Sequence, residues 1–336
     1  MNNDLIDGFL EQLEHNKGRS VLTIKKYRNF LNRLLAWSKK EELDFLKLDI
    51  KNLENFTGMI AHEQGLTPRS RRPLVAAIRG FYKYLLKDGV ITTDPAINLP
   101  YPQVGKKLPV AMSLKNAERL IMQPGLETFP GIRDTAIITL FVGTGIRLAG
   151  LRVLNESNLI FTDIDGQEWL ILKVLEKGDK ERLIPVPHEA RHLIRAYLHH
   201  KDMAKIDRTL PNGDKVLFVS LGNKNVKPHE YHGEVRRISD SGIQKMFTKH
   251  AMNAGLPKNQ QHPHSLRHLF GTELAENDVQ DSIRQVLMGH SDPASTQIYT
   301  HLAARKLAKE VDRANPLKNI TTPMTAITKE LLRHGR

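Results

Sequence analysis

The sequence predicts a mainly α-helical protein of two domains, the second of which also contains a small antiparallel sheet. Apolar residues recur with a period near 3.6 over much of the 336-residue chain, as on the buried face of a helix. A proline-rich stretch at residues 96–112 separates two such regions. In the second region, two short apolar runs flank a Lys-Gly-Asp turn, which predicts a hairpin.

The first domain is predicted at residues 1–95 and consists of helices. One apolar face is centred on Phe9, a second helix begins near Ser20, a residue type that caps helices, and a third helix runs through Phe81. Residues 96–112 cannot continue a helix, because proline has no amide hydrogen and clashes with the preceding turn. We therefore expect an extended linker there.

The second domain is predicted at residues 113–315. The expected helices span residues 132–142, 189–203, 241–253, 265–276, 279–287 and 295–310, and the expected strands span residues 169–175 and 183–186. Residues 211–236 contain a middle rich in Gly, Asn and Lys, which predicts an exposed loop. In the tail at residues 316–336, Thr322 and Pro323 predict the start of a short amphipathic helix that needs a surface to cover its apolar side.

The composition favours an anionic partner and argues against a membrane or metal protein. The formal net charge is +13 and the pI is about 9.7. No run of about 18 apolar residues occurs, as a membrane-spanning helix would need. The absence of cysteine excludes disulfides and thiolate metal sites and agrees with a cytoplasmic location. The 15 histidines include no His-Glu-x-x-His pattern, so no metal is expected.

Basic residues lie off the apolar faces of two helices in the first domain, namely Lys25, Lys26, Arg28, Arg69, Arg71, Arg72 and Arg79. A run of charges is usually only the solvated face of a helix, and any one of these residues alone would be interpreted in this way. Their clustering on two helices of one small domain favours contacts with phosphate groups. We therefore predict that this surface binds a nucleic acid.

The residues with the most reactive chemistry lie near the C-terminus, where His264, Arg267 and His268 are followed by His290 and Tyr299. A positioned imidazole, guanidinium and phenol can together attack a phosphodiester. The phenol can act as a nucleophile, but its ordinary pKa of about 10 means that a base must take its proton. An arginine can bind two phosphate oxygens and neutralise the charge that develops in the transition state. His264 and Arg267 are three residues apart and so share one helix face.

Two upstream segments complete this set. Residues 143–148 read Gly-Thr-Gly-Ile-Arg-Leu, and residues 176–182 read Glu-Lys-Gly-Asp-Lys-Glu-Arg. In order and spacing the blocks resemble those of the tyrosine recombinases, also called the phage integrase family. That pattern is T-G-x-R, then K-G-x-K-x-R, then H-x-L-R-H, then L-G-H, and a tyrosine nine residues later. Only the leucine of L-G-H differs, at Met288.

The resemblance implies a site-specific recombinase of the Xer type, with a SAM-like core-binding first domain and the tyrosine recombinase fold in the second. The implied catalytic residues are Arg147, Lys177, His264, Arg267, His290 and Tyr299, with His268 shaping the pocket. By this resemblance Lys177 is expected to protonate the leaving oxygen, with Lys180 as its nearest rival. The reaction is expected to proceed through a 3′-phosphotyrosine and a Holliday junction without ATP, metal or other cofactor.

The resemblance also implies the partners. These are double-stranded DNA at specific recombination sites and a homo-tetramer on that DNA, acting alone or with a second recombinase. The expected location is the bacterial cytoplasm, in association with the nucleoid. Residues 323–334 are expected to dock on a neighbouring protomer, and the competing expectation is that they fold back on their own domain.

One departure from the family pattern leaves alternatives open. Gly150 stands where the family usually has an acidic residue, three positions after Arg147, and Asp134 or Glu156 could replace it. Without a carboxylate here the protein could be a catalytically weakened DNA-binding regulator of the same fold. A type IB topoisomerase would share the chemistry, although the Xer-like first domain favours recombination. A nucleotide-binding loop is excluded, because neither G-x-G-x-x-G nor G-K-S/T occurs.

Overall fold

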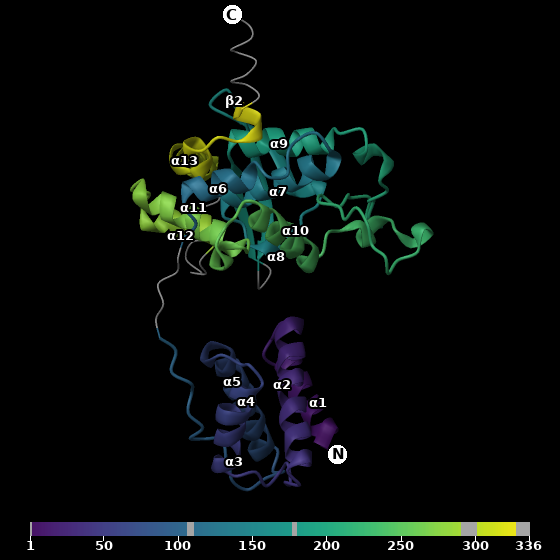
Figure 1. The fold of residues 1–336 in the computed structure, drawn as a ribbon, viewed down its shortest axis with the longest axis vertical. Helices are drawn as coiled ribbons and strands as arrows, with labels where there is room; N and C mark the ends of the chain where they lie inside the picture. Colours follow the sequence, from purple (N-terminus) through teal and green to yellow (C-terminus); the bar gives the residue numbers. More distant parts are fainter. Residues whose placement is uncertain (1, 106–110, 177–179, 290–300, 327–336) are drawn as a thin grey trace, which may run out of the picture. The chain divides into compact units, whose positions relative to one another are not determined.

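The computed structural model describes residues 2–105, 111–176, 180–289 and 301–326. The chain divides into two compact units, an N-terminal unit of Met1–Lys107 and a C-terminal unit of Leu108–Arg336. Helices dominate both units (Figure 1). Within the described residues the strands form one three-stranded sheet. The predicted mainly α-helical class with a small antiparallel sheet is therefore confirmed.

The N-terminal unit contains α1 (Asn2–His15), α2 (Val21–Lys40), α3 (Ile50–Asn55), the π-helix η1 (Phe56–Ile60), α4 (Ala61–Glu63) and α5 (Pro68–Lys87). The three helices expected from periodicity are α1, α2 and α5. Their apolar faces meet around Phe81, whose ring centroid lies 5.7 Å from that of Phe9 and 5.6 Å from that of Phe45. The buried Tyr82 hydroxyl donates to the Phe45 carbonyl at 2.8 Å, which fixes the chain between α2 and α3.

The segment after α5 packs onto the N-terminal unit. Ala96 and Leu99 are fully buried in its core. The Tyr101 ring lies under the guanidinium groups of Arg72 and Arg79, at 5.5 and 5.4 Å from its centroid. The absence of helix here agrees with the proline content, but residues up to Tyr101 are held against α5 and do not run freely toward the next domain.

The C-terminal unit contains α6 (Leu114–Ile121), α7 (Phe129–Thr144), α8 (Leu148–Arg152), β1 (Leu159–Ile164), β2 (Gln167–Glu176), β3 (Lys180–Val186), α9 (His188–Leu198), α10 (Asp240–Asn253), α11 (His264–Glu276), α12 (Asp281–Met288) and α13 (His301–Ala314). Short 3₁₀ turns lie at Glu156–Asn158, Met203–Lys205, Pro228–Glu230, Gly233–Arg236, Lys258–Gln260 and Pro316–Asn319. Of the described helices, none is long and apolar enough to cross a membrane.

Helix α7 forms the centre of this unit. Nearly all of its residues are buried, and α9, α11 and β3 pack around it. Its first residue, Phe129, stacks on Tyr197 of α9 with ring centroids 5.5 Å apart. Burial raises the pKa of the Tyr197 phenol, which donates a hydrogen bond to the Leu217 carbonyl at 3.1 Å. The rigid packing of α7 fixes the position at which the chain leaves it, and this is where the candidate site begins.

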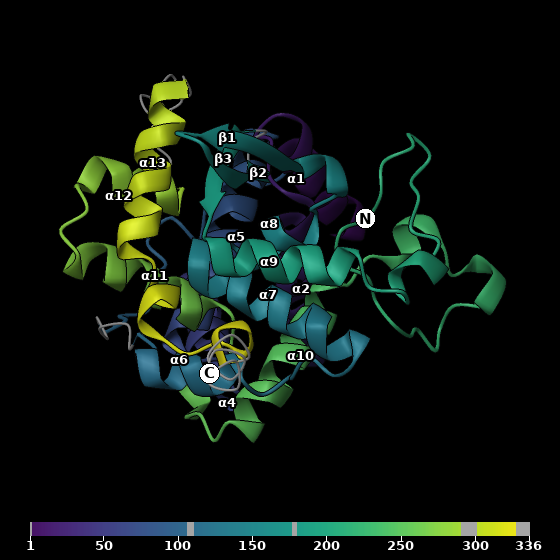
Figure 2. The same cartoon turned by 90° about the horizontal axis from the view of Figure 1, so that it is seen from above.

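The sheet has the order β1-β2-β3 with antiparallel pairs, and Val174 of β2 lies opposite Arg182 of β3. Helix α13 lies along β3 (Figure 2). Ala308 of α13 packs on Trp169 and Ile171 of β2, and Arg305 forms an ion pair of 2.7 Å with Asp165 in the β1–β2 turn. The sheet therefore holds the helix that follows the predicted nucleophile in sequence.

Several boundaries differ from the sequence prediction. Strand β1 and helix α6 were not expected, and α9 ends at Leu198 rather than at residue 203. Residues 199–239 form a long irregular excursion held by Arg237, which donates to the carbonyls of Arg152 and Leu154 at 3.1 and 2.9 Å. The predicted helix at 295–310 corresponds to α13, and its first six positions lie outside the described residues.

The described part of the tail packs on its own unit. Thr322 is fully buried, its hydroxyl donates to Glu189 of α9, and its side chain caps the turn that begins with Pro323 by accepting from the Thr325 amide at 3.2 Å. Met324 packs against the core of the same unit. Residues 327–334, the remainder of the segment expected to dock on a neighbouring protomer, lie outside the described residues.

Candidate active site

The first predicted catalytic arginine follows a helix end that requires glycine. Helix α7 ends at Thr144, and Gly145 adopts the left-handed conformation with φ 58°. A Cβ at Gly145 would lie 2.5 Å from Cδ1 of the buried Phe270, so both the backbone and the available space exclude a side chain. Arg147 comes two residues later as the N-cap of α8.

The second predicted arginine, Arg267, joins two helix ends. It lies one turn into α11 and its side chain is only 4% exposed. One terminal nitrogen donates to the Gly145 carbonyl at 2.6 Å, and the other donates to the Met288 carbonyl at the end of α12. These carbonyls have no donor within their own helices, so the guanidinium satisfies them while its orientation is fixed.

Arg147 reaches the same end of α12. Its Nη2 donates to the Gly289 carbonyl at 2.7 Å, and Gly289 ends the helix with φ 61°. The structure thus brings Arg147 and Arg267 onto two consecutive carbonyls, immediately before His290 in sequence. Both predicted phosphate-binding groups therefore lie at one point of the fold.

The two histidines of α11 lie beside this point with their rings edge to face. The ring centroids of His264 and His268 are 4.5 Å apart. Burial lowers the pKa of His264, and the positive charge of His268, Arg267, His262 and Arg147 lowers it further. Burial also lowers the pKa of His268. His264 therefore favours its neutral form, which is the form that can accept a proton.

Three predicted catalytic residues, Lys177, His290 and Tyr299, lie outside the described residues, as does the side chain of Lys180. Within the parts of the chain that the structure describes, no three His, Cys, Asp or Glu residues gather closely enough to hold a metal ion.

Gly150 lies in a filled environment. A Cβ at this position would meet Cγ1 of the buried Val174 at 3.0 Å. The two acidic residues considered as replacements bind elsewhere: Asp134 accepts from Arg133 at 2.6 Å and contacts His250 at 2.9 Å, and Glu156 pairs with Arg208. The structure therefore identifies no substitute carboxylate at Asp134 or Glu156, and Val174 occupies the space into which a side chain at position 150 would extend.

The predicted DNA-binding residues fall into two groups. Lys25, Lys26 and Arg69 are exposed and form no hydrogen bond or ion pair within the described residues, and Arg72 is exposed beside Tyr101. The other three have partners within the unit: Arg28 pairs with Asp7, and Arg79 donates to the Leu99 carbonyl at 3.3 Å.

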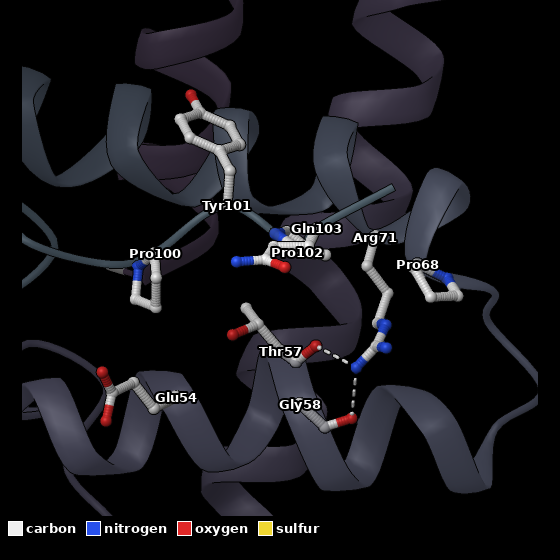
Figure 3. A pocket seen from close by; sticks show the side chains of 9 residues that line it. All are labelled: Glu54, Thr57, Gly58, Pro68, Arg71, Pro100, Tyr101, Pro102 and Gln103. Atoms are coloured by element: carbon white, nitrogen blue, oxygen red, sulfur yellow. Dashed lines mark hydrogen bonds between the residues drawn. The ribbon is translucent and has the colours of Figure 1, made fainter. Parts of the chain in front are cut away.

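Arg71, the third residue of this group, donates to the carbonyls of Gly58 and Thr57 at 3.0 and 3.4 Å (Figure 3). It lines a cavity of about 290 Å³ beside the π-helix η1. The guanidinium thus ties the start of α5 to two carbonyls of the π-helix, of which that of Gly58 also accepts from the Ala61 amide. Arg71 consequently has a structural task that the sequence pattern did not reveal.

Sequence reasoning also missed Arg182, which was recognised only as the last letter of the K-G-x-K-x-R pattern. Its side chain is 4% exposed, and its Nη1 donates to the Leu287 carbonyl. The signal that could have identified it is its charge: an arginine at a buried strand position needs a specific partner.

Comparison with known proteins places both units in one family. Residues 112–306 match the family model described as the phage integrase family, and residues 6–89 match the phage integrase N-terminal SAM-like domain. Tyrosine recombinase XerC of Pseudomonas aeruginosa is 34% identical over 317 residues, covering 93% of this chain and 94% of the relative. XerC of Azotobacter vinelandii is 32% identical over 314 residues, covering 93% and 95%.

Solved structures share the fold. XerH site-specific recombinase bound to its difH substrate aligns with a TM-score of 0.64 at 19% identity, covering 88% of this chain and 80% of that one. A lambda integrase dimer bound to a COC′ core site aligns with a TM-score of 0.62 at 15% identity, covering 86% and 95%.

Proposed function

The chain belongs to the phage integrase family as a tyrosine-type site-specific recombinase, and we propose that it cuts and rejoins duplex DNA through a covalent 3′-phosphotyrosine on Tyr299. The observation that carries this proposal is the convergence of Arg147 and Arg267 on adjacent carbonyls beside His264. This arrangement supplies two fixed cations and a neutral base at one point, which is what in-line attack on a phosphodiester requires.

The chemistry balances without an external reactant. The Tyr299 oxygen attacks the phosphorus, the bond from phosphorus to the 5′-oxygen breaks, and a free 5′-hydroxyl leaves. His264 accepts the phenol proton, and Lys177 gives a proton to the departing oxygen. The phosphodiester is exchanged for a phosphotyrosine of similar energy, so rejoining is the same reaction in reverse and needs no ATP or metal.

The arginines contribute electrostatic stabilisation. A guanidinium held from behind by a carbonyl keeps its remaining N–H groups directed at the nonbridging phosphate oxygens, together with His290. Removing one such preorganised donor typically lowers the rate by about 10²–10³-fold. The lowered pKa of His264 supports its role as base, because a protonated imidazole could not receive the phenol proton.

The N-terminal unit is proposed to bind DNA through its exposed cations, Lys25, Lys26, Arg69 and Arg72. The net charge of +13 and the DNA-bound recombinase XerH among the structural neighbours support double-stranded DNA as the partner. Because Arg28, Arg71 and Arg79 bind groups within the unit, we assign them mainly to holding its shape.

Recombination further requires an assembly. We propose four protomers on two DNA sites, exchanging strands through a Holliday junction, either as one protein or with a second recombinase. We propose that the residues beyond Ala326 dock on a neighbouring protomer, since Thr322 and Met324 already pack on their own unit.

The test is covalent trapping. The wild-type protein is incubated with fragmented genomic DNA and denatured, and DNA that stays attached is sequenced to identify the site. Tyr299→Phe should abolish this attachment and leave DNA binding intact. Attachment that persists in Tyr299→Phe would show that another residue is the nucleophile.

Plasmids that carry paired copies of the recovered DNA site distinguish the three alternative functions. Recombinant circles indicate a recombinase, relaxation alone indicates a type IB topoisomerase activity, and binding without either indicates the weakened regulator that the loss of an acidic residue at Gly150 would produce.

A further inference from the structure

Three arginines meet at the C-terminal end of α12. Three consecutive carbonyls, those of Leu287, Met288 and Gly289, accept hydrogen bonds from Arg182, Arg267 and Arg147 in that order. They come from three different elements: strand β3, helix α11 and the N-cap of α8. A helix C-terminus offers carbonyls without donors and carries partial negative charge, so it is suited to receive guanidinium groups.

Arg182 differs from the other two in its role. Like Arg267 it is only 4% exposed, but it lies on strand β3 and the proposed mechanism gives it no contact with DNA. A buried guanidinium is costly unless it is well paired, so its presence calls for a specific purpose. It lies on β3, five positions after Lys177 in sequence, and it binds the end of α12, which precedes His290 in sequence.

We propose that Arg182 is a positioning residue for strand cleavage. By holding the Leu287 carbonyl it fixes the last turn of α12, so that the next two carbonyls keep Arg267 and Arg147 aimed at the scissile phosphate. This proposal rests on the proposed function. Since misplacement of a reacting group by about 1 Å can lower a rate by about 10²-fold, loss of Arg182 should slow cleavage by roughly 10- to 100-fold while DNA affinity changes little.

The test compares Arg182→Met and Arg182→Lys with a matched control, Arg191→Met. Arg191 is also buried, at 8% exposure in the same unit, and it also donates to a backbone carbonyl, that of Glu168 on strand β2. Cleavage is measured in single turnover on a nicked duplex carrying the site recovered by trapping. We expect Arg182→Met to be slow, Arg182→Lys to be intermediate because it keeps one donor, and Arg191→Met to remain near the wild-type rate.

A second substrate separates positioning from general destabilisation. Replacing one nonbridging oxygen of the scissile phosphate by a methyl group removes the charge that the arginines neutralise. If Arg182 acts through Arg147 and Arg267, the ratio of wild-type to Arg182→Met rates should shrink toward one on this neutral substrate. An unchanged ratio, a wild-type rate for Arg182→Met, or an equal loss in Arg191→Met would each overturn the proposal.

Amide hydrogen exchange gives a readout that does not depend on DNA cleavage. Exchange at Met288 and Gly289 should accelerate in Arg182→Met but not in Arg191→Met. If the wild-type protein forms no DNA adduct, the proposed function fails, and the exchange result still decides whether Arg182 holds this turn. Unaltered exchange in Arg182→Met would refute the inference that Arg182 fixes the last turn of α12.

Discussion

Replacing Gly145 by alanine should destabilise the C-terminal unit through two separate effects. The φ of 58° costs an L-residue about 1–2 kcal/mol, because its Cβ approaches the following carbonyl. The new Cβ would also lie 2.5 Å from Cδ1 of Phe270, whose ring is fully buried, and such overpacking typically costs about 1–3 kcal/mol. We therefore expect a loss of about 2–5 kcal/mol in the free energy of unfolding.

The chain provides a control for the backbone term. Gly166, in the β1–β2 turn, has a φ of 77°, and a Cβ there would meet no heavy atom within 4 Å. Gly166→Ala should therefore cost only the conformational term of about 1–2 kcal/mol. The difference between the two variants measures the clash with Phe270.

The assay is urea unfolding followed by tryptophan fluorescence. The chain has two tryptophans, Trp37 in the N-terminal unit and Trp169 in the C-terminal unit. In a Trp37→Phe background the remaining signal reports on the unit that contains Gly145. If Gly145→Ala proves no less stable than Gly166→Ala, the packing argument is wrong. Cleavage should also fall at least about 10-fold in Gly145→Ala, because the displaced carbonyl no longer positions Arg267.

Three further predictions concern the site and its supports. The cleavage rate should stay high as the pH falls below 6.5 and decline only when the pH reaches the lowered pKa of His264, because burial and nearby positive charge disfavour the imidazolium. In a single-turnover pH profile, His264→Gln should remove this decline and lower the rate by about 10²–10⁴-fold. Arg69→Ala should reduce the slope of log affinity against log salt by about 0.9 in a fluorescence titration, whereas Arg71→Ala should leave the slope unchanged and lower the stability of the N-terminal unit. Asp165→Asn should remove the ion pairs of Asp165 with Arg305 and Lys309 and so weaken the attachment of α13 to the β1–β2 turn by about 0.2–1 kcal/mol. The measurement is amide exchange, which should be faster in α13 and not elsewhere.

The helices and the hairpin were predictable because their signals are local. The break after α7 could be recognised from Gly145, whose conformation few other residues adopt. Strand β1 had no such signal, because all of its residues are exposed or half-buried and show no clean alternation of apolar and polar side chains. The packing of Ala96 and Leu99 onto the N-terminal unit was also hidden, since it depends on surfaces distant in sequence.

The reactive groups of the candidate site stay a prediction from the sequence, whereas the backbone groups that hold Arg147 and Arg267 could not be predicted from it. The chemistry of an arginine or histidine can be recognised from the residue type alone. A carbonyl belongs to every residue, so nothing in the letters Leu-Met-Gly at positions 287–289 indicates that they receive three guanidinium groups. For the same reason Arg71 resembled its exposed neighbour Arg69, although it serves the π-helix.

Carbonyl anchors suit arginines that must bind phosphate. A carboxylate would orient a guanidinium as firmly, but its full negative charge would offset the positive charge meant for the phosphate and would repel the incoming anion. A carbonyl carries only a partial charge, so under the proposed mechanism it holds Arg147 and Arg267 in place and leaves most of their charge for the phosphate. In a chain with Gly150 where the family usually has an acidic residue, and with Val174 filling the adjoining space, orientation depends more heavily on the end of α12. Substitution of the residues that fix this turn, foremost Arg182 and Gly289, should therefore lower the cleavage rate more than substitution elsewhere in the unit.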